Sequence, residues 1–288
     1  MNKSERLAFF ITLLICAVAS LSFRWPLDEG RITSSFGESR ADHFHDGIDM
    51  VCPDDKIYPV DKGKLVYYWD ESIFPLDTIP GGGNFRVLLH EKGIYSIYMH
   101  LKGGAREMSS YGKKDLIGTI GNSGHSYARH LHFSMLKKSE RASLNPMGLL
   151  PSWPDKKAPE IKGFLLHIGE RYITLKENGE IRLTRHYPLL VSIADTITGK
   201  ERLGIHRLIV AHNGKEIFNT EFKDIRFSPE GLQVGNRPFE GIFDPKGYYR
   251  ITGVRYSTGS NSFSVKAVDF AGNVSEKIFT CTVNLDME

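Results

Sequence analysis

The chain has 288 residues, a length that suits two domains of ordinary size. Hydrophobic residues make up 41% of it, aromatic residues 11% and charged residues 25%, which is the composition of a globular protein and excludes a disordered, collagen-like or coiled-coil chain. The 37 Lys and Arg against 34 Asp and Glu give a net charge of +3. Because the basic residues are scattered along the chain, no nucleic acid is expected as a partner.

The first 19 residues have the features of an export signal. A cationic start precedes an apolar run over residues 7–19 that ends in the small-x-small sequence AVA, so cleavage is expected after Ala19. The mature protein would then be exported, to the periplasm or the cell envelope. One alternative is a retained membrane anchor, because the apolar stretch continues weakly to Phe23. Another is lipid attachment at Cys16, although an isoleucine occupies the preceding position, where a small residue is expected.

Cysteine usage points away from a disulfide-stabilised protein. Once the signal is removed, only Cys52 and Cys281 remain, one in each half of the chain, so no disulfide framework is expected. Cys52 follows a stretch rich in potential metal ligands and could itself be a ligand. The prediction is that Cys52 is instead a small packed side chain.

The first half of the chain contains short β-like runs separated by glycine-rich turns. These runs cover residues 64–69, 85–90, 94–101, 116–121 and 130–136. No long helical period appears, which favours a mainly β fold.

Histidines in the first half lie next to an acid and glycines. In the sequence HDGID, His45 and Asp49 are four residues apart, a spacing that places both on one face of an extended segment or of a helical turn. In the strand-like HLH, the period of two directs His130 and His132 to the same side. A His, Asp and His ligand set suits Zn²⁺ and leaves a fourth position open for water, so the expected chemistry is hydrolysis.

The residue that activates water must come from outside the commonest zinc-peptidase motif. HExxH is excluded because His90-Glu91 is followed by Ile94 at the required position. His100 and His130 lie at strand ends, and imidazole titrates near the working pH, so both are candidate general bases.

From residue 30 to residue 150 the chain resembles LytM/lysostaphin-type zinc metallopeptidases, which cut the peptides of bacterial cell-wall peptidoglycan. The motifs that carry the resemblance, in order, are RITSSFG at 31–37, HDGID at 45–49, GNF at 83–85 with YMHL at 98–101, and GNSG at 121–124 leading to HLHF at 130–133. The resemblance implies an antiparallel β-sheet peptidase domain that acts on peptidoglycan peptides. It also implies zinc ligands and catalytic histidines that activate water and stabilise the tetrahedral oxyanion. The implied zinc ligands are His45, Asp49 and His132, and the implied catalytic histidines are His100 and His130.

The sequence departs from this family pattern in two places. Residues 70–82 are longer than the usual hairpin turn and form either a groove wall or a tolerated surface loop, and Ala128-Arg129 replaces the usual Gly-Pro. Substrate preference therefore does not follow from the resemblance. Three further histidines are expected to have no chemical role, although the first two lie in loops where they could touch substrate: His43, His125 and His90.

A proline-rich segment over residues 145–160 interrupts helix and strand alike. We place the domain boundary there, at a joint that few contacts are expected to cross. The expected units are a signal peptide over residues 1–19, a peptidase domain over 20–157 and a second domain over 158–288.

The second half also contains recurrent β-like runs, which suggest a β-sandwich. They cover residues 164–169, 172–177, 188–195, 206–222, 262–270 and 277–285. Asn213-Gly214 is typical of a tight hairpin. Residues 262–276 resemble a strand and turn of bacterial immunoglobulin-like or fibronectin-like modules, so an immunoglobulin-like sandwich is expected. No site comparable to that of the first half is apparent, and the second domain is interpreted as a spacer or as a module that binds the wall or a protein.

Together, these features predict an exported zinc-dependent endopeptidase of peptidoglycan peptides. The alternative is a non-hydrolytic activator or scaffold of other wall hydrolases, because some family members have lost zinc ligands and act in that way. All the expected ligands are present here, which favours the enzyme. A membrane is expected as a partner only if the signal segment is retained.

Overall fold

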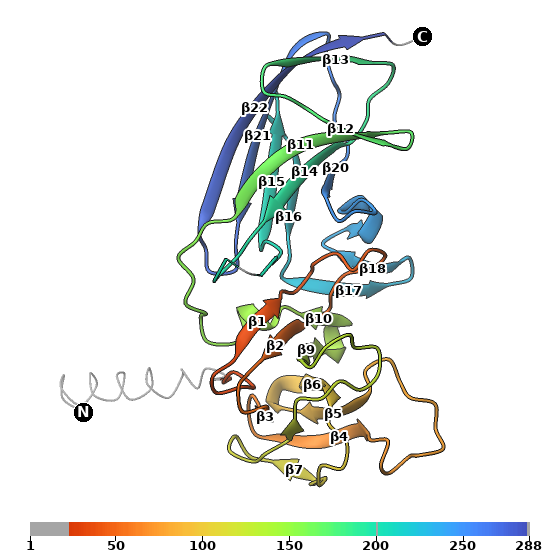
Figure 1. The fold of residues 1–288 in the computed structure, drawn as a ribbon, viewed down its shortest axis with the longest axis vertical. Helices are drawn as coiled ribbons and strands as arrows, with labels where there is room; N and C mark the ends of the chain where they lie inside the picture. The colour runs from red at the N-terminus through yellow and green to blue at the C-terminus, as the bar shows by residue number, and fades with distance from the viewer. Residues whose placement is uncertain (1–22, 200, 287–288) are drawn as a thin grey trace, which may run out of the picture.

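Figure 1 shows a computed structural model in which β-strands make up nearly all of the regular structure. It describes residues 23–199 and 201–286, so the expected signal peptide over residues 1–19 lies outside the described residues. Within this part, the helical elements are short 3-10 turns: η1 Glu91–Gly93, η2 Lys138–Glu140, η3 Pro146–Gly148 and η4 Phe239–Gly241. No helix in the described part is long and apolar enough to cross a membrane. The predicted fold class, mainly β, is confirmed.

The first half forms an antiparallel sheet in which β9 is central to the site. The strands are β1 Arg31–Ser34, β2 Ile48–Val51, β3 Lys56–Ile57, β4 Gly63–Trp69, β5 Asn84–Leu89, β6 Ile94–Leu101, β7 Ser110–Tyr111, β8 Gly118–Thr119, β9 Leu131–Lys137 and β10 Ala142–Leu144. They pair in the order β10-β9-β6-β5-β4-β7, with β2 joining β9 and β1 joining β2, while β3 and β8 pair with each other in a separate two-stranded sheet. Alternation along β6 buries Ile94 and Tyr98, and the Tyr98 ring packs 5.2 Å from that of Phe133 in β9. Strands cover the predicted runs over 64–69, 85–90, 94–101 and 130–136 to within one residue at each end, whereas the predicted run over 116–121 contains only the short strand β8.

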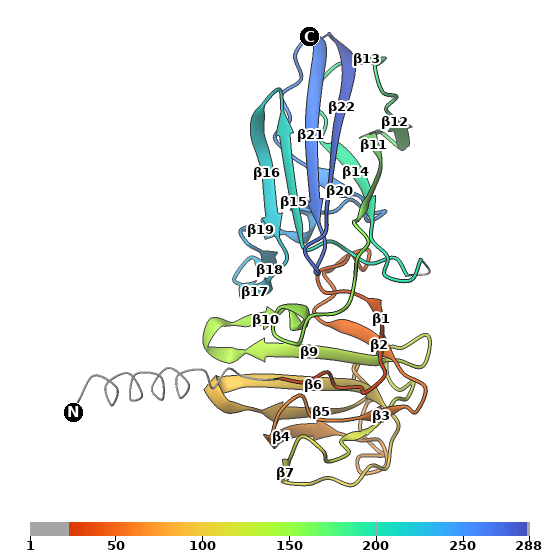
Figure 2. The same ribbon diagram turned by 90° about the vertical axis from the view of Figure 1, so that its left-hand side faces the viewer.

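The second half forms two further sheets that face each other (Figure 2). The strands are β11 Glu160–Ile168, β12 Arg171–Thr174, β13 Gly179–Leu183, β14 Leu189–Ala194, β15 Arg207–His212, β16 Lys215–Glu221, β17 Asp224–Ser228, β18 Gly231–Val234, β19 Arg237–Pro238, β20 Tyr249–Ile251, β21 Gly259–Val268 and β22 Val274–Leu285. One sheet has the order β12-β11-β14-β20 and the other β13-β22-β21-β15-β16. Phe164 in β11 stacks on Phe279 in β22, with 4.3 Å between ring centroids, so the sheets share a core.

The second half contains the predicted hairpin turn, but one of its sheets has a parallel strand pair. The tight turn at Asn213-Gly214 is confirmed, because both residues have positive φ (49° and 79°) and join β15 to β16. Strand β13 pairs with β22 in parallel, so the sandwich is not purely antiparallel. The immunoglobulin-like assignment stays a prediction.

The first sheet continues across the expected domain boundary. Strand β17 pairs with β10, with Ser143 opposite Ile225, and β18 and β19 extend the sheet further. Phe44, from the first half, packs 5.3 Å from Phe239 and 6.1 Å from Phe243. The expectation that few contacts cross the joint is therefore wrong, because strands of the second half provide the edge partner that β10 would otherwise lack.

Candidate metal centre

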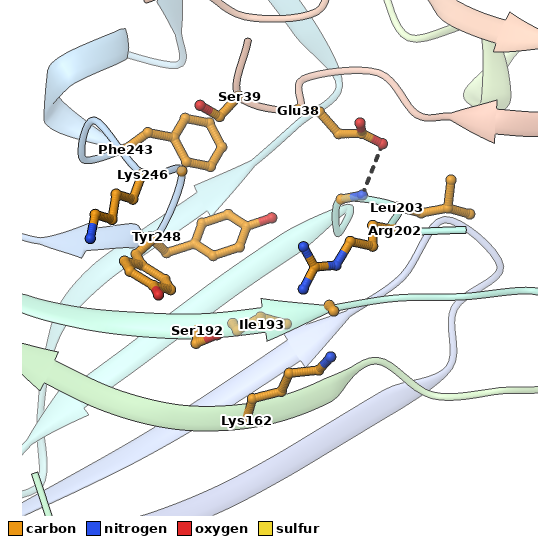
Figure 3. Close-up of a pocket in the computed structure, with 14 residues that line it drawn as sticks. Glu38, Ser39, Lys162, Ser192, Ile193, Arg202, Leu203, Phe243, Lys246 and Tyr248 are labelled. Atoms are coloured by element: carbon orange, nitrogen blue, oxygen red, sulfur yellow. Dashed lines mark hydrogen bonds between the residues drawn. The ribbon is translucent and has the colours of Figure 1, made fainter. Parts of the chain in front are cut away.

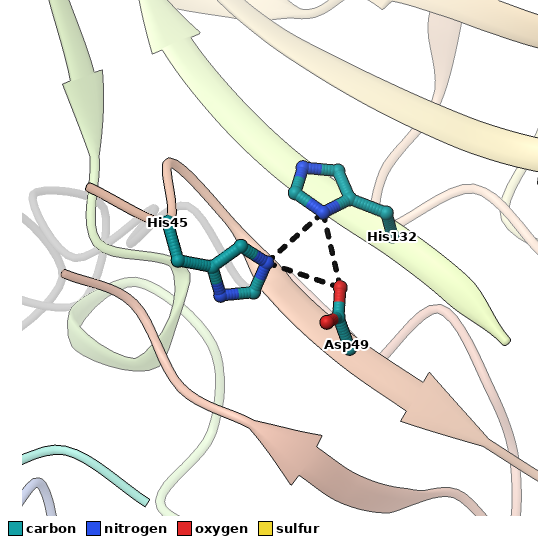
Figure 4. Close-up of side chains that lie close together, drawn as sticks. All are labelled: His45, Asp49 and His132. Atoms are coloured by element: carbon teal, nitrogen blue, oxygen red, sulfur yellow. Dashed lines mark hydrogen bonds and ion pairs between the residues drawn. The ribbon is translucent and has the colours of Figure 1, made fainter. Parts of the chain in front are cut away.

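Two neighbouring strands place an acid and a histidine side by side. Strand β2 pairs antiparallel with β9, and in this register Asp49 lies directly opposite His132. Residues opposite each other in such a pair have their Cβ atoms only about 5 Å apart. His45 lies just before β2 and reaches the same point, as Figure 4 shows.

The donor atoms of His45, Asp49 and His132 form a nearly equilateral triangle. His45 Nε2 is 3.0 Å from His132 Nδ1, and each of these nitrogens is 3.0 Å from Asp49 Oδ1. The three side chains have the ligand types and the spacing needed to hold a metal ion. The structure thus brings together the three predicted ligands.

Hydrogen bonds from outside the triangle fix the protonation of each ring. His45 Nδ1 lies 2.8 Å from the Ser35 carbonyl oxygen, which can only accept, so Nδ1 carries the proton and Nε2 presents its lone pair inward. His132 Nε2 lies 3.3 Å from Asp46 Oδ1 and 2.9 Å from Ser134 Oγ. Donation to the Asp46 carboxylate leaves His132 Nδ1 facing the centre.

Asp49 and His132 stabilise each other's charge. Burial opposes ionisation of Asp49, but hydrogen bonds from His132 and His45 outweigh it and hold the pKa of Asp49 well below its usual range. Burial likewise opposes protonation of His132, while hydrogen bonds to Asp46 and Asp49 raise its pKa to about 9. Arg40 Nη2 donates to the outer oxygen of Asp49, Oδ2, at 2.6 Å. The pocket therefore favours an ionised Asp49 and a positive charge beside it.

This donor set fits zinc. When only the outer nitrogens are protonated, three acceptor atoms face one another at 3.0 Å, and a cation can then take the place of the proton that otherwise links His132 to Asp49. Tetrahedral zinc with ligands at about 2.0–2.2 Å would place those ligands about 3.3 Å apart, close to the observed separations. Two imidazoles and one carboxylate also leave one tetrahedral position open.

A glycine makes the close approach of β2 and β9 possible. A Cβ atom on Gly47 would come within 2.5 Å of the Phe133 carbonyl oxygen, 2.6 Å of Ser134 Oγ and 2.8 Å of His132 Nε2. Any side chain at this position would push His132 out of the triangle. This contact explains the glycine between His45 and Asp49.

His100 and His130 lie beside the triangle with their Nε2 atoms available. The His100 and His130 rings are 4.8 Å apart, and His130 Nε2 lies 3.6 Å from Asp49 Oδ1. His100 Nδ1 donates to the Ser123 carbonyl oxygen and His130 Nδ1 to that of Ala128, each at 2.8 Å. Burial lowers the pKa of His100 to about 4, which keeps this ring neutral. His100 also has a positive φ of 61°, an uncommon backbone conformation of the kind found at functional sites.

A groove of about 950 Å³ opens over these residues. Its wall includes His43 and His125, so the two histidines expected to be bystanders in fact face the groove. Tyr127 projects fully into solvent at the rim. Arg202, from the second half of the chain, also lines the groove.

The other side chains considered from the sequence lie apart from the centre. His90 is buried, donates to the Lys62 carbonyl oxygen and contacts Ser96 Oγ, and it does not line the groove. Cys52 is half-buried against the core, consistent with its predicted role. Residues 70–82 are absent from the groove lining, but the Gly81 carbonyl oxygen accepts from the backbone N–H of His125, so the segment is hydrogen-bonded to a loop that lines the groove.

Sequence reasoning missed the side chains that hold the ligands from outside. Asp46 lies within the recognised HDGID motif, but its contact with His132 depends on the pairing of β2 with β9. Arg40 and Arg202 lie in loops that line the groove, and no sequence motif around either residue indicates this position. Sequence reasoning also missed a cluster of three carboxylates in the second half, Asp155, Asp195 and Asp269.

One family model matches the part of the chain that contains the residues of the candidate metal centre. Residues 43–146 match the model of Peptidase family M23, and this range includes all five residues assigned from the motifs. Residues 158–284 match a second family model that carries no functional description. No curated protein matches the chain in sequence.

Several solved structures are similar to parts of the chain. A zinc-containing peptidase from Vibrio cholerae is 25% identical over 40% of this chain and 36% of its own length, with a TM-score of 0.33. The catalytic domain of lysostaphin from Staphylococcus simulans is 24% identical over 41% of this chain and 90% of that domain, with a TM-score of 0.34. Full lysostaphin is 14% identical over 90% of this chain and 100% of its own, with a TM-score of 0.37. The chain thus spans about a third of the Vibrio cholerae peptidase, and the similarity to Peptidase family M23 is confined to residues 43–146.

Proposed function

We propose that this chain is an exported zinc-dependent endopeptidase that hydrolyses peptide bonds in bacterial cell-wall peptidoglycan. The observation that carries the proposal is the triangle of His45 Nε2, Asp49 Oδ1 and His132 Nδ1, whose outer hydrogen bonds turn all three donor atoms inward. The match to Peptidase family M23 supports peptide hydrolysis at the level of the family.

In this proposal His45, Asp49 and His132 hold Zn²⁺, while His100 and His130 move protons. When bound, zinc supplies Lewis-acid polarisation of the water and of the scissile carbonyl group. Neutral His100 presents an Nε2 lone pair able to take a proton from the attacking water, because its Nδ1 is engaged by the Ser123 carbonyl oxygen. His130 Nε2 is available from the adjacent position to donate to the oxyanion or to the leaving amine once that ring is protonated.

Export is the part of the proposal that rests on residues 1–19, outside the described structure. The mass of the protein recovered from the cell envelope tests it. A mature chain that begins after Ala19 supports export with cleavage, whereas a chain that keeps these residues in a membrane fraction supports the anchor.

Digestion of purified muropeptides by the zinc-loaded mature chain tests the activity. Mass spectrometry should find products with new amine and carboxyl termini, each cleavage adding one water. Zinc bound at one equivalent with every muropeptide intact would contradict the enzyme and favour a non-hydrolytic activator of other wall hydrolases.

A further inference from the structure

A second hollow lies between the two halves of the chain, next to the groove of the candidate metal centre; Figure 3 shows the residues that line it. Its walls come from both halves and include Lys162 in β11 and Lys246. Glu38 and Arg202 line both this hollow and the groove, so the two spaces are neighbours on either side of these side chains. A peptide lying across the metal centre would thus leave it along a surface built partly by the second half.

The loop that carries Arg202 is fixed to the metal centre through Ser35. The backbone N–H of Gly204 donates to Ser35 Oγ at 2.8 Å and to Glu38 Oε1 at 3.1 Å. The carbonyl oxygen of the same Ser35 accepts the hydrogen bond that orients His45. Ser35 is therefore hydrogen-bonded both to His45 and to the loop of Arg202, and it fixes the position of that loop relative to the candidate metal centre.

Arg202 is distinguished from the other arginines of the groove by its lack of an acidic partner. Arg40 is bound to Asp49, and Arg129 is paired with Asp55. The Arg202 side chain is exposed and, within residues 23–199 and 201–286, has no hydrogen bond or ion pair.

In the lining of the hollow, the acid Glu38 already has hydrogen-bond partners, and the other charged side chains, Lys162, Arg202 and Lys246, are positive. The Glu38 carboxylate accepts from Ser34 Oγ, from Ser35 Oγ and from the Gly204 N–H. Lys162 contributes a second cation, with only a loose contact of 3.9 Å to Glu160. The passage out of the groove is thus basic, and a guanidinium is suited to bidentate binding of a carboxylate.

We propose that Arg202, assisted by Lys162, forms a subsite for a free carboxylate on the peptide substrate, so that the second half of the chain selects acidic peptides for the metal centre. This inference rests on the proposed function. It predicts that a substrate bearing its carboxylates is preferred over the same substrate in amide form. Because the ion pair would be partly exposed, the expected preference is about tenfold.

The test compares a soluble cross-linked muropeptide with the same molecule after its carboxylates have been amidated. Affinity for each form is measured by titration in a His130→Ala background, which slows turnover about 10²- to 10⁴-fold, and kcat/KM is measured separately in the native chain. The variants are Arg202→Gln and, as a matched control, Arg255→Gln, which removes the same charge from an exposed position of the second half. Zinc content and melting temperature should be unchanged in both.

The acid form should bind about tenfold more tightly than the amide form, Arg202→Gln should abolish this difference, and Arg255→Gln should keep it. Lys162→Gln should reduce the difference in part. A wild-type protein with equal affinity for both forms, or an Arg202→Gln protein that keeps the preference, would overturn the inference. If neither form is cleaved, the proposed function is contradicted, while the affinities still decide the role of Arg202.

Discussion

Two clusters in the described part of this molecule each bring together three side chains of metal-ligand type, and they differ in how the donor atoms are oriented. His45, Asp49 and His132 converge in the first half, and three carboxylates converge in the second half, each set with one ligand atom per residue within 4.8 Å of the others. In the first cluster, outer partners turn every donor inward and a groove opens above. The second cluster consists of Asp155, Asp195 and Asp269.

In the second cluster the carboxylates accept hydrogen bonds from groups close to them in the sequence. Asp269 Oδ1 accepts from the N–H groups of Ala271 and Asn273, and its Oδ2 accepts from Asn273 Nδ2. Asp155 and Asp195 each accept from a backbone N–H close by in sequence. Convergence of ligand types alone is therefore not sufficient, because the donor atoms must also be freed and aimed by other residues.

Charge distinguishes the clusters in the same way. In the first, hydrogen bonds with His132 and His45 keep Asp49 ionised despite burial. In the second, burial, followed by the charges of Asp269 and Asp155, raises the pKa of Asp195 to about 7. The first cluster stabilises the ionised form of Asp49, whereas the second favours the protonated form of Asp195.

The largest expected effect comes from removing a ligand. Asp49→Ala and His132→Ala should lose zinc and all measurable peptidase activity, because two donors hold the ion poorly. His100→Ala and His130→Ala should keep zinc and lose about 10²- to 10⁴-fold in rate, because each removes only a proton-transferring group. Elemental analysis and muropeptide turnover separate the two classes.

The assignment within His130-Leu131-His132 depends on one outcome of that series. A folded His130→Ala protein purified without zinc, beside a His132→Ala protein that retains it, would exchange the roles of the two histidines.

Truncation tests whether the metal centre depends on the second half. A chain covering residues 20–157 exposes the edge of β10 that β17 normally pairs, and it also exposes Phe44, which packs on Phe239. We expect aggregation or a markedly lower melting temperature, because an unpaired strand edge and an apolar face become exposed together. Size-exclusion chromatography with light scattering measures this. A monomeric fragment with native zinc content and stability would show that the first half folds independently.

Asp195→Asn should change the pH dependence of stability. The folded-state pKa of Asp195, about 7, is above the ordinary value for aspartate, so its contribution is fully present below about pH 4 and is lost as pH rises through 7. The amide removes that loss while keeping the acceptor for the Thr196 N–H. At pH 8 the variant should gain up to about 3 kcal/mol in free energy of unfolding, with little change at pH 4.

Urea denaturation at the two pH values measures the effect of Asp195→Asn. Asp77→Asn, on an exposed loop, serves as the control and should show no pH-dependent gain. An equal change at both pH values would mean that Asp195 is charged without penalty in the folded protein.

Cys52→Ser should have the smallest effect. Its Sγ atom lies 3.4 Å from Asp54 Oδ1, and Cys52 lies outside the triangle, so zinc content and activity should stay near those of the wild type. Loss of zinc from a variant with native circular dichroism would make Cys52 a ligand.

The sequence predicts features whose signals are local. Asn213-Gly214 identifies the β15–β16 hairpin because few residue pairs accept two positive φ values. The ligands His45, Asp49 and His132 follow from motifs whose spacing reflects β2 and β9. Spacing alone does not separate the metal ligands from the catalytic histidines, because His130 and His132 share one face. The resemblance assigns His132 as a ligand and His100 and His130 as catalytic.

Features that depend on distant pairing could not be predicted. Nothing near Ile225 indicates that its strand completes a sheet begun in the first half, because register across 82 residues is set by tertiary packing. The approach of Arg202 to the groove likewise depends on the hydrogen bonds of Gly204 with Ser35 and Glu38. The carboxylate cluster was missed because Asp155, Asp195 and Asp269 lie in separate loops.

The most direct test of the central claim is an anomalous difference map at the zinc absorption edge from crystals of the zinc-loaded mature chain. We predict one strong peak about 2.0–2.2 Å from His45 Nε2, Asp49 Oδ1 and His132 Nδ1, with none at Asp155, Asp195 and Asp269. A peak only at the carboxylate cluster, or coordination through His130 in place of His132, would contradict the account.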